Sequence, residues 1–299
     1  MTIPAHGAVD YRPLFAEERQ ALLDLLRELA DAEWARPTPC PGWTVLDLAR
    51  HLLGDDMGLL ARQRDDFFGI PPPAELPDEA DFVRWLDALQ DEWVRATRRL
   101  SPQLVVDLLA WTGPRVVETW QRQDPSELAA SVSWASSGPV PRWLDQGREL
   151  SEQWIHRQQL HMALSHPVDL DSGTASAVLD TLKWAYPRRL ASAPRPRGDM
   201  VSIIVLGSLK RHWVLEANGP EWEFVEGHGR RVVATLRLTT DQAWRLLTNN
   251  MPAAEQRHLE VTGDAVITEI LVRTRAIIGL PNTAVQRLGR PGTGPSGTT

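Results

Sequence analysis

The stretch TPCPGWTVLDLARHLLGD, residues 38–55, decides how the first part of this chain folds. Its beginning is rich in proline and glycine and predicts a loop, because these residues interrupt helical periodicity. Thr44 then has the character of a helix N-cap, with Asp47 three residues later in a variant of the capping box. The helix that begins there is expected to reach about Phe68, and it carries His51 in its second turn.

A second stretch, RELSEQWIHRQQLHMAL at residues 148–164, lies in a helix that we predict from about residue 142 to 164. Residues four apart stack on one face of a helix, so Glu152 and His156 can converge on one ion while His51 approaches from another helix. Two imidazoles and a carboxylate can hold a divalent metal and still leave coordination positions open. That arrangement is typical of a catalytic metal site.

The same residues allow a simpler interpretation, and their spacing leaves both open. The face that carries Glu152 and His156 could be solvated, in which case the two form an ordinary ion pair of small energetic consequence. His51 lies away from the main apolar stripe of its own helix. Cys40, the only cysteine, is interpreted as a structural thiol rather than a nucleophile, because nothing near it in sequence would lower its pKa.

Composition narrows the class of protein. With 299 residues the chain is long enough for two domains, and its net charge of -7 offers no broad attraction to nucleic acid or anionic lipid. A single cysteine excludes an intramolecular disulfide framework and cysteine-based zinc or iron–sulfur sites. The first twenty residues lack a signal-peptide pattern, and no 18 apolar residues run together. We therefore expect a soluble cytoplasmic protein that binds neither nucleic acid nor membrane.

Residues 1–190 are predicted to form an all-helical bundle with extended loops. Within the fourth expected helix, Gly113 and Pro114 should interrupt the helical path, and Pro187 should end the last one. The expected helices are 11–34, 44–68, 82–100, 102–123, 142–164 and 174–186.

Beyond a linker at 191–199 the period of the pattern falls to two, which indicates strands. In RRVVATLRL, alternate residues from Val232 to Leu238 are expected to share one face. The other candidate strands are VSIIVLGSL, RHWVLEA and HLEVTGD, interleaved with helices at TTDQAWRLLTNN and GDAVITEILVRTRAII. Residues 200–286 should therefore form a small α+β domain, followed by a disordered tail at 287–299.

Two motifs resemble a known family. CPGWTVLDLARHL, followed about a hundred residues later by Glu-x-x-x-His, is similar to the mycothiol-dependent maleylpyruvate isomerase group within the DinB superfamily. TTDQAWRLLTNN and LEVTGDAVITEILVRTRAIIG resemble the C-terminal domain of that group, which is similar to sterol-carrier domains. The resemblance implies an α+β fold class in which a DinB-like four-helix bundle precedes a sterol-carrier-like domain.

The resemblance also implies a metal site formed by His51, Glu152 and His156, with zinc as the usual metal and mycothiol as a thiol cofactor in an actinobacterial cytoplasm. A metal-bound thiolate would attack a small-molecule electrophile, in either a cis–trans isomerase of the maleylpyruvate type or a thiol S-transferase. Two alternatives stay open, a non-enzymatic metal-dependent binding protein and a hydrolase that uses metal-bound water. We expect a monomer or homodimer.

A substrate pocket is expected between the two domains, where ligands commonly bind. Arg273 and Arg275 on the last helix are candidates for contacting a dicarboxylate or the polar groups of the thiol. Trp111, Trp120 and Trp134 lie near the loops and favour a substrate larger or more apolar than maleylpyruvate.

Overall fold

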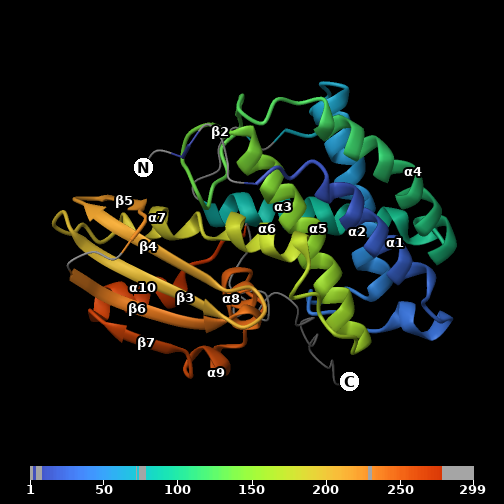
Figure 1. The fold of residues 1–299 in the computed structure, drawn as a ribbon. Helices are drawn as coiled ribbons and strands as arrows, with labels where there is room; N and C mark the ends of the chain where they lie inside the picture. Colours follow the sequence, from blue (N-terminus) through green and yellow to red (C-terminus); the bar gives the residue numbers. More distant parts are fainter. Residues whose placement is uncertain (1–2, 5–8, 72, 74–78, 228–230, 278–299) are drawn as a thin grey trace, which may run out of the picture.

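The computed structural model combines a helical part with a smaller sheet-containing part (Figure 1). The residues that it describes are 3–4, 9–71, 73, 79–227 and 231–277. The tail predicted at 287–299 and the last residues of the expected second domain lie outside these ranges. The helical elements of the first part are α1 (Leu14–Arg27), η1 (Asp31–Ala35), α2 (Val45–Leu59), η2 (Leu60–Arg64), α3 (Glu79–Ala96), η3 (Thr97–Arg99), α4 (Pro102–Gln121), α5 (Arg142–Leu164), α6 (Gly173–Leu182) and α7 (Ala185–Leu190).

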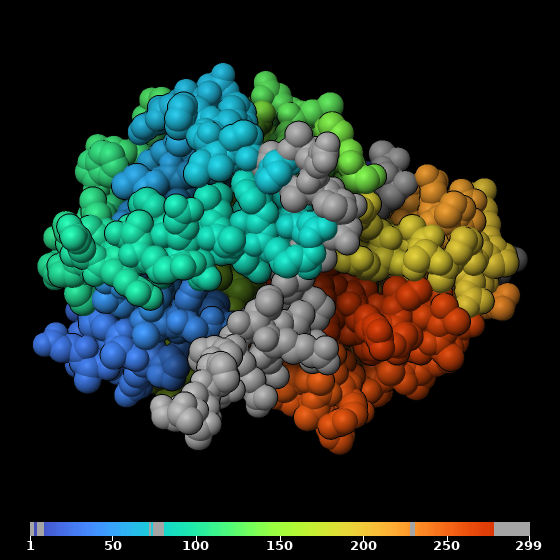
Figure 2. All heavy atoms as spheres, turned by 180° about the vertical axis from the view of Figure 1, so that it is seen from behind, coloured from blue at the N-terminus to red at the C-terminus, as the bar shows by residue number. Residues whose placement is uncertain are grey.

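The helices α1, α2, α4 and α5 form the bundle that the sequence predicted. α1 and α2 each contact both α4 and α5, and α3 packs on α2 from outside. Figure 2 shows α3, in cyan to teal, crossing the outer surface of the helical part. A short pair of strands, β1 (Leu128–Ala129) and β2 (Val140–Pro141), lies just before α5. The predicted fold class, a helical bundle followed by a small α+β part, is confirmed.

The start of α2 follows the predicted capping box. The Thr44 side chain accepts a hydrogen bond from the backbone N–H of Asp47 at 3.2 Å, and the Asp47 carboxylate accepts one from the backbone N–H of Thr44 at 3.2 Å. The loop before it turns at Gly42, whose φ of 82° is a left-handed conformation that glycine adopts without strain. The cap and the turn together fix where α2 begins, and so place His51 in its second turn.

Three predicted helix boundaries were wrong. The helix expected to reach about Phe68 ends as α2 at Leu59 and continues only as the short η2 to Arg64. The first helix ends at Arg27 instead of continuing to about residue 34, because the backbone is extended at Ala30 and its N–H is capped by the Glu33 carboxylate, which begins η1. The helix predicted to stop before Pro187 divides into α6 and α7. Pro187 lies in the first turn of α7, where a missing backbone N–H costs nothing.

The predicted interruption of the fourth helix is also absent: α4 continues through Gly113 and Pro114. An internal proline costs a helix about 3 kcal/mol. The buried face of α4, which includes Leu109, Val116 and Trp120, packs against the rest of the bundle and outweighs that cost. Gly113 lets the Arg19 side chain lie against the helix, since a Cβ there would stand 2.7 Å from Arg19 Cγ.

The second part is built on a five-stranded mixed sheet with the order β5-β4-β3-β6-β7. β3 and β6 are parallel, and the remaining neighbours are antiparallel. α10 lies against one face of the sheet, which in Figure 1 is the face turned away from the viewer. The elements are β3 (Asp199–Leu206), β4 (Arg211–Asn218), β5 (Glu221–Phe224), β6 (Arg231–Thr239), α8 (Thr240–Leu247), α9 (Ala253–Gln256), β7 (Glu260–Gly263) and α10 (Ala265–Arg273).

The alternation predicted for β6 holds for most of the strand. Ala234, Leu236 and Leu238 are buried on one face, but Val232 is 51% exposed. The pairing of β3 with β6 shifts register between Met200 and Val201, so β6 carries one extra residue at this point. The bulge therefore separates Val232 from the face that its spacing alone would assign to it.

One apolar core continues from the helices into the sheet. Trp154 on α5 packs edge-to-face on Trp244 of α8, with ring centroids 5.5 Å apart. The same core includes Leu182 and Leu236, while the C-terminal end of α5, with Leu160, belongs to the core of the bundle. The helix α5 thus contributes to both cores, and the domain boundaries at 190 and 200 stay a prediction. Among the described helices, none combines the length and apolar character that crossing a membrane requires.

Gly54 permits the close approach of α3 to α2. A Cβ at Gly54 would lie 2.6 Å from Trp93 Nε1, the indole nitrogen that donates a hydrogen bond to the Arg50 carbonyl at 2.7 Å. We expect Gly54→Ala to lower the free energy of unfolding by about 1–3 kcal/mol, as overpacking of this kind does. Chemical denaturation measures this change.

Gly58, one turn later on α2, provides the matched control. A Cβ there would meet only the terminal Nη1 of Arg62, at 2.9 Å, and that flexible side chain can move away. Gly58→Ala should therefore leave stability unchanged or raise it by up to about 1 kcal/mol through helix propensity. Equal effects of the two substitutions would contradict the packing argument.

Candidate metal site

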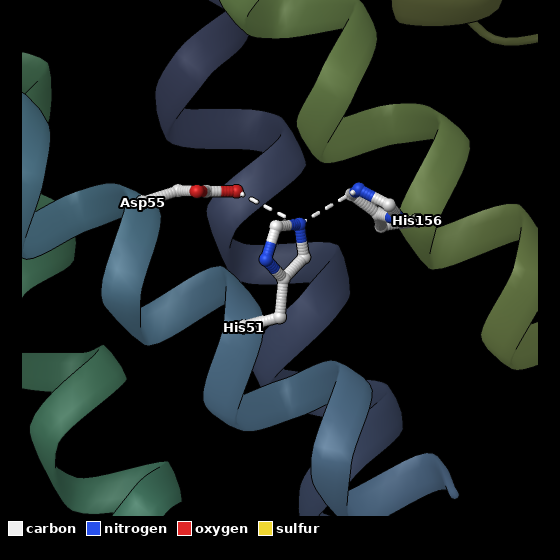
Figure 3. A group of neighbouring side chains, drawn as sticks. All are labelled: His51, Asp55 and His156. Carbon is white, nitrogen blue, oxygen red and sulfur yellow. Dashed lines mark hydrogen bonds and ion pairs between the residues drawn. The ribbon is translucent and has the colours of Figure 1, made fainter. Parts of the chain in front are cut away.

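Three side chains converge where α2 faces α5. His51 and Asp55 lie one turn apart on α2, and His156 approaches from α5 (Figure 3). His51 Nε2 lies 3.1 Å from His156 Nε2 and 3.1 Å from Asp55 Oδ2. One donor atom from each residue lies within 4.8 Å of the other two. This is the spacing of a group that could share one metal ion.

Gln90, on α3, determines how the His51 ring is protonated. Its amide Nε2 lies 3.3 Å from Asp55 Oδ1, and because a carboxylate oxygen accepts, the amide donates there. Gln90 Oε1 consequently points to His51 Nδ1, at 3.2 Å, and accepts its proton. The neutral His51 ring then carries its lone pair on Nε2, the atom that faces His156.

Gln159 performs the same task for His156. Its Oε1 lies 2.8 Å from His156 Nδ1, and its Nε2 donates to Asn250 Oδ1 at 3.0 Å. Desolvation lowers the pKa of His51 to about 4 and that of His156 to about 3, so both rings are neutral near pH 7. Two ring nitrogens without a proton then face one another beside Asp55 Oδ2, and this donor set fits a divalent cation.

Acidic side chains crowd around this group. Burial, with the nearby charges of Asp55 and Glu149, raises the pKa of Glu152 to about 7, although Arg148 acts in the opposite direction. Burial, followed by the charge of Glu149, also raises the pKa of Asp55 well above its ordinary value. Arg148 is itself engaged with Glu149, at 2.6 Å. The surplus of carboxylates disfavours their charged forms in the metal-free chain, and a bound cation would relieve it.

The structure places the predicted ligands close together. His51 and His156 meet through their Nε2 atoms, and Glu152 Oε2 lies 3.8 Å from His156 Nε2. Glu152 stands outside the compact group, in which the carboxylate is Asp55. The assignment of Glu152 as a ligand therefore stays a prediction, and Asp55 is an additional candidate that the sequence analysis missed. Asp55 follows His51 by four residues, so the rule that paired Glu152 with His156 would have found it.

The loop ahead of α2 lines the same region. The Trp43 ring lies 4.9 Å from the His51 ring, and the Trp43 indole N–H donates to Asp91 at 3.0 Å. The Cys40 thiol donates to Gln159 Oε1 at 3.1 Å. Desolvation raises the pKa of Cys40 to about 12, so the side chain is a protonated thiol, which agrees with the structural role predicted for it.

The arginines and tryptophans suggested for substrate binding do not gather here. Arg273 is exposed and paired with Glu269, and Arg275 donates to the carbonyls of Val272 and Thr274. Trp120 and Trp134 are fully buried in the core, whereas Trp111 is half exposed and stacks against Arg115. Bulky indoles fill the cores of this protein, and their number alone therefore says little about the size of a substrate.

Fold and site together define a class: a helical bundle with a His/Asp/His group between facing helices, joined to a small α+β part. Residues 15–161 match the family described as the mycothiol maleylpyruvate isomerase N-terminal domain. Most of the helical part of the chain is thus similar to that family, and the resemblance predicted from the motifs is confirmed.

Two solved structures are similar to most of the chain. A crystal structure of the mycothiol-dependent maleylpyruvate isomerase aligns with a TM-score of 0.51 at 15% identity, covering 89% of this chain and 98% of that one. A single-substitution mutant of that enzyme aligns with a TM-score of 0.48 at 15% identity, covering 82% of this chain and 91% of that one. At such identity the first likeness shows a shared fold. No curated protein matches the chain significantly.

Separate substitutions test the two candidate carboxylates. We expect Asp55→Asn and Glu152→Gln each to weaken Zn²⁺ binding by at least about tenfold, because each removes a negative oxygen from beside the imidazole pair. Competition with a chromophoric chelator measures the affinity. Asp91→Asn is the control, since Asn keeps the oxygen that accepts from Trp43 and lies outside the group. Wild-type affinity in both test variants would show that neither carboxylate helps to hold the ion.

Proposed function

We propose that this chain is a metal- and mycothiol-dependent enzyme in which the thiolate attacks a small-molecule electrophile. The observation that carries the proposal is the pair of Nε2 atoms on His51 and His156 that face each other at 3.1 Å, each ring held at its Nδ1 by a glutamine. The family that the helical part resembles supports the thiol, and the fold shared with the maleylpyruvate isomerase supports the arrangement of both parts. Zinc is the metal that we propose, and an actinobacterial cytoplasm is the proposed setting.

His51, His156 and the carboxylate of Glu152 or Asp55 would hold the ion. A divalent cation bound there would supply Lewis acidity and lower the pKa of a coordinated thiol, which is ordinarily about 8.5. Gln90 and Gln159, which hold the Nδ1 atoms of the two rings, would leave both Nε2 atoms free to bind the ion. The Trp43 ring covers one side of His51 and limits the access of water to it.

Two reactions share the attack by thiolate. In an isomerase, the thiolate would add to one carbon of an activated cis alkene, rotation would occur about the former double bond, which is now single, and elimination would return the trans alkene and the thiolate. In an S-transferase, the thiolate displaces a leaving group and the conjugate departs. The partners are thus a low-molecular-weight thiol and a small electrophile. The isomerase requires no net consumption of thiol, and this difference can be measured.

Alanine substitutions test the proposal. We expect His51→Ala and His156→Ala to lose stoichiometric metal and to lower mycothiol-dependent turnover at least about 100-fold, since loss of a ligand should exceed the loss of a residue that only orients one. Maleylpyruvate isomerisation and formation of S-conjugates from a panel of electrophiles are the two assays. His258→Ala changes an exposed histidine in the second part and is the control. The assignment fails if metal content and thiol-dependent turnover both survive replacement of His51, Glu152 and His156.

Two other functions would give different results. Turnover of a substrate without added thiol, dependent on the same residues, would identify a hydrolase that uses metal-bound water. Calorimetric binding of a thiol or electrophile without turnover would identify a binding protein.

A further inference from the structure

An unbroken line of hydrogen bonds leads from the second part of the chain to His156. It begins at the turn after α8, where Asn250 Nδ2 lies 3.0 Å from the Thr248 carbonyl oxygen and 2.9 Å from Thr248 Oγ1. The backbone N–H of Asn250 donates to the Arg245 carbonyl at 2.8 Å, which holds the turn against the end of α8. Asn250 is therefore held by hydrogen bonds at both its backbone and its side chain.

The first bond, between Asn250 and the Thr248 carbonyl, determines which atom donates in every later bond of this line. A carbonyl oxygen can only accept, so the amide group of Asn250 that faces Thr248 O must be its NH₂. Asn250 Oδ1 then faces Gln159 and accepts from Gln159 Nε2 at 3.0 Å. Gln159 Oε1 is left facing His156 Nδ1, at 2.8 Å, and an oxygen there requires the proton on Nδ1. The His156 lone pair consequently lies on Nε2.

Cys40 reinforces the same orientation of the Gln159 amide. Its thiol donates to Gln159 Oε1 at 3.1 Å, so a flipped amide would place an NH₂ group against both the thiol and His156 Nδ1. Gln159 is 8% exposed, which leaves little water to compensate a wrong orientation. The line Thr248–Asn250–Gln159–His156 is thus defined by geometry at every step.

We propose that Gln159 and Asn250 are positioning residues through which the second part of the chain holds His156 in its metal-binding tautomer. This inference rests on the proposed function, because it assigns that tautomer a role in holding the ion. It also gives the α+β part a task in metal binding that is separate from substrate recognition. His51 obtains the same tautomer within the bundle, from Gln90 and Asp55. His156 instead depends on Asn250, which lies 91 residues after Gln159 in the chain.

Two substitutions of Gln159 distinguish positioning from packing. Gln159→Glu keeps an oxygen that accepts from His156 Nδ1, whereas Gln159→Met keeps the length of the side chain and removes the acceptor. We expect Gln159→Met to weaken Zn²⁺ binding about 10–100-fold and Gln159→Glu to bind clearly more tightly than Gln159→Met. A packing role predicts the reverse order, because methionine suits a buried position and an added carboxylate does not.

Asn250→Ala tests the contribution of the second part. The substitution leaves the Gln159 amide free to flip, and we expect Zn²⁺ affinity to fall about tenfold. Thr248→Val is the matched control: it perturbs the same turn by removing the Oγ1 contact but retains the backbone carbonyl that anchors Asn250. Equal weakening by Asn250→Ala and Thr248→Val would overturn the proposal.

The tautomer is also measurable without metal. In metal-free protein labelled with ¹⁵N-histidine, the His156 ring should show its proton on Nδ1, with a shift toward the Nε2-protonated form in Asn250→Ala. A proton on Nε2 in the unsubstituted chain would overturn the inference about positioning. Failure of the unsubstituted chain to bind Zn²⁺, with the tautomer as expected, would instead overturn the proposed function and with it the role of the line in metal binding.

Discussion

The structure of the site depends on two imidazoles that face each other through nitrogens lacking a proton. Two such acceptors 3.1 Å apart repel each other unless a cation or a shared proton lies between them. The low pKa values of His51 and His156 keep both rings neutral near pH 7, and the amide oxygens at Nδ1 hold the remaining ring proton away from Nε2. The bundle tolerates this because the Nδ1 atoms on the far sides of both rings are paired with amide oxygens. These hydrogen bonds at Nδ1 hold both rings in place despite the repulsion between their Nε2 atoms.

The helices are spaced to make those outer bonds possible. Gly54 allows α3 to approach α2, and the indole of Trp93 on α3 then bonds to the backbone of α2. This contact brings Gln90, three residues before Trp93, within reach of the His51 ring and of Asp55. These three residues depend on one another. Gly54 permits α3 to approach α2, the bond from Trp93 fixes the distance between the two helices, and Gln90 therefore reaches His51.

The sequence predicted the parts of this arrangement that follow from local rules. The Thr44 cap, the position of His51 in α2 and the helical spacing of Glu152 and His156 all depend on neighbouring residues, and the structure retains them. Asp55 follows His51 by the same four-residue spacing, so local rules also place it beside His51. Gln90 and Asn250 belong to other elements, and glutamine and asparagine are common polar residues that carry no signal until the fold brings them to the rings. The continuity of α4 through Pro114 was likewise decided by tertiary packing.

The helix α5 has a further consequence for how this protein can be divided. It carries Trp154 in the core shared with the sheet and Leu160 in the core of the bundle, with His156 between them. Cutting the chain at residues 191–199 would therefore uncover Trp154 by removing Trp244, its edge-to-face partner. Each fragment would expose apolar surface that the other covers in the intact chain. Replacing the second part with that of a relative would therefore require a part whose surface matches α5.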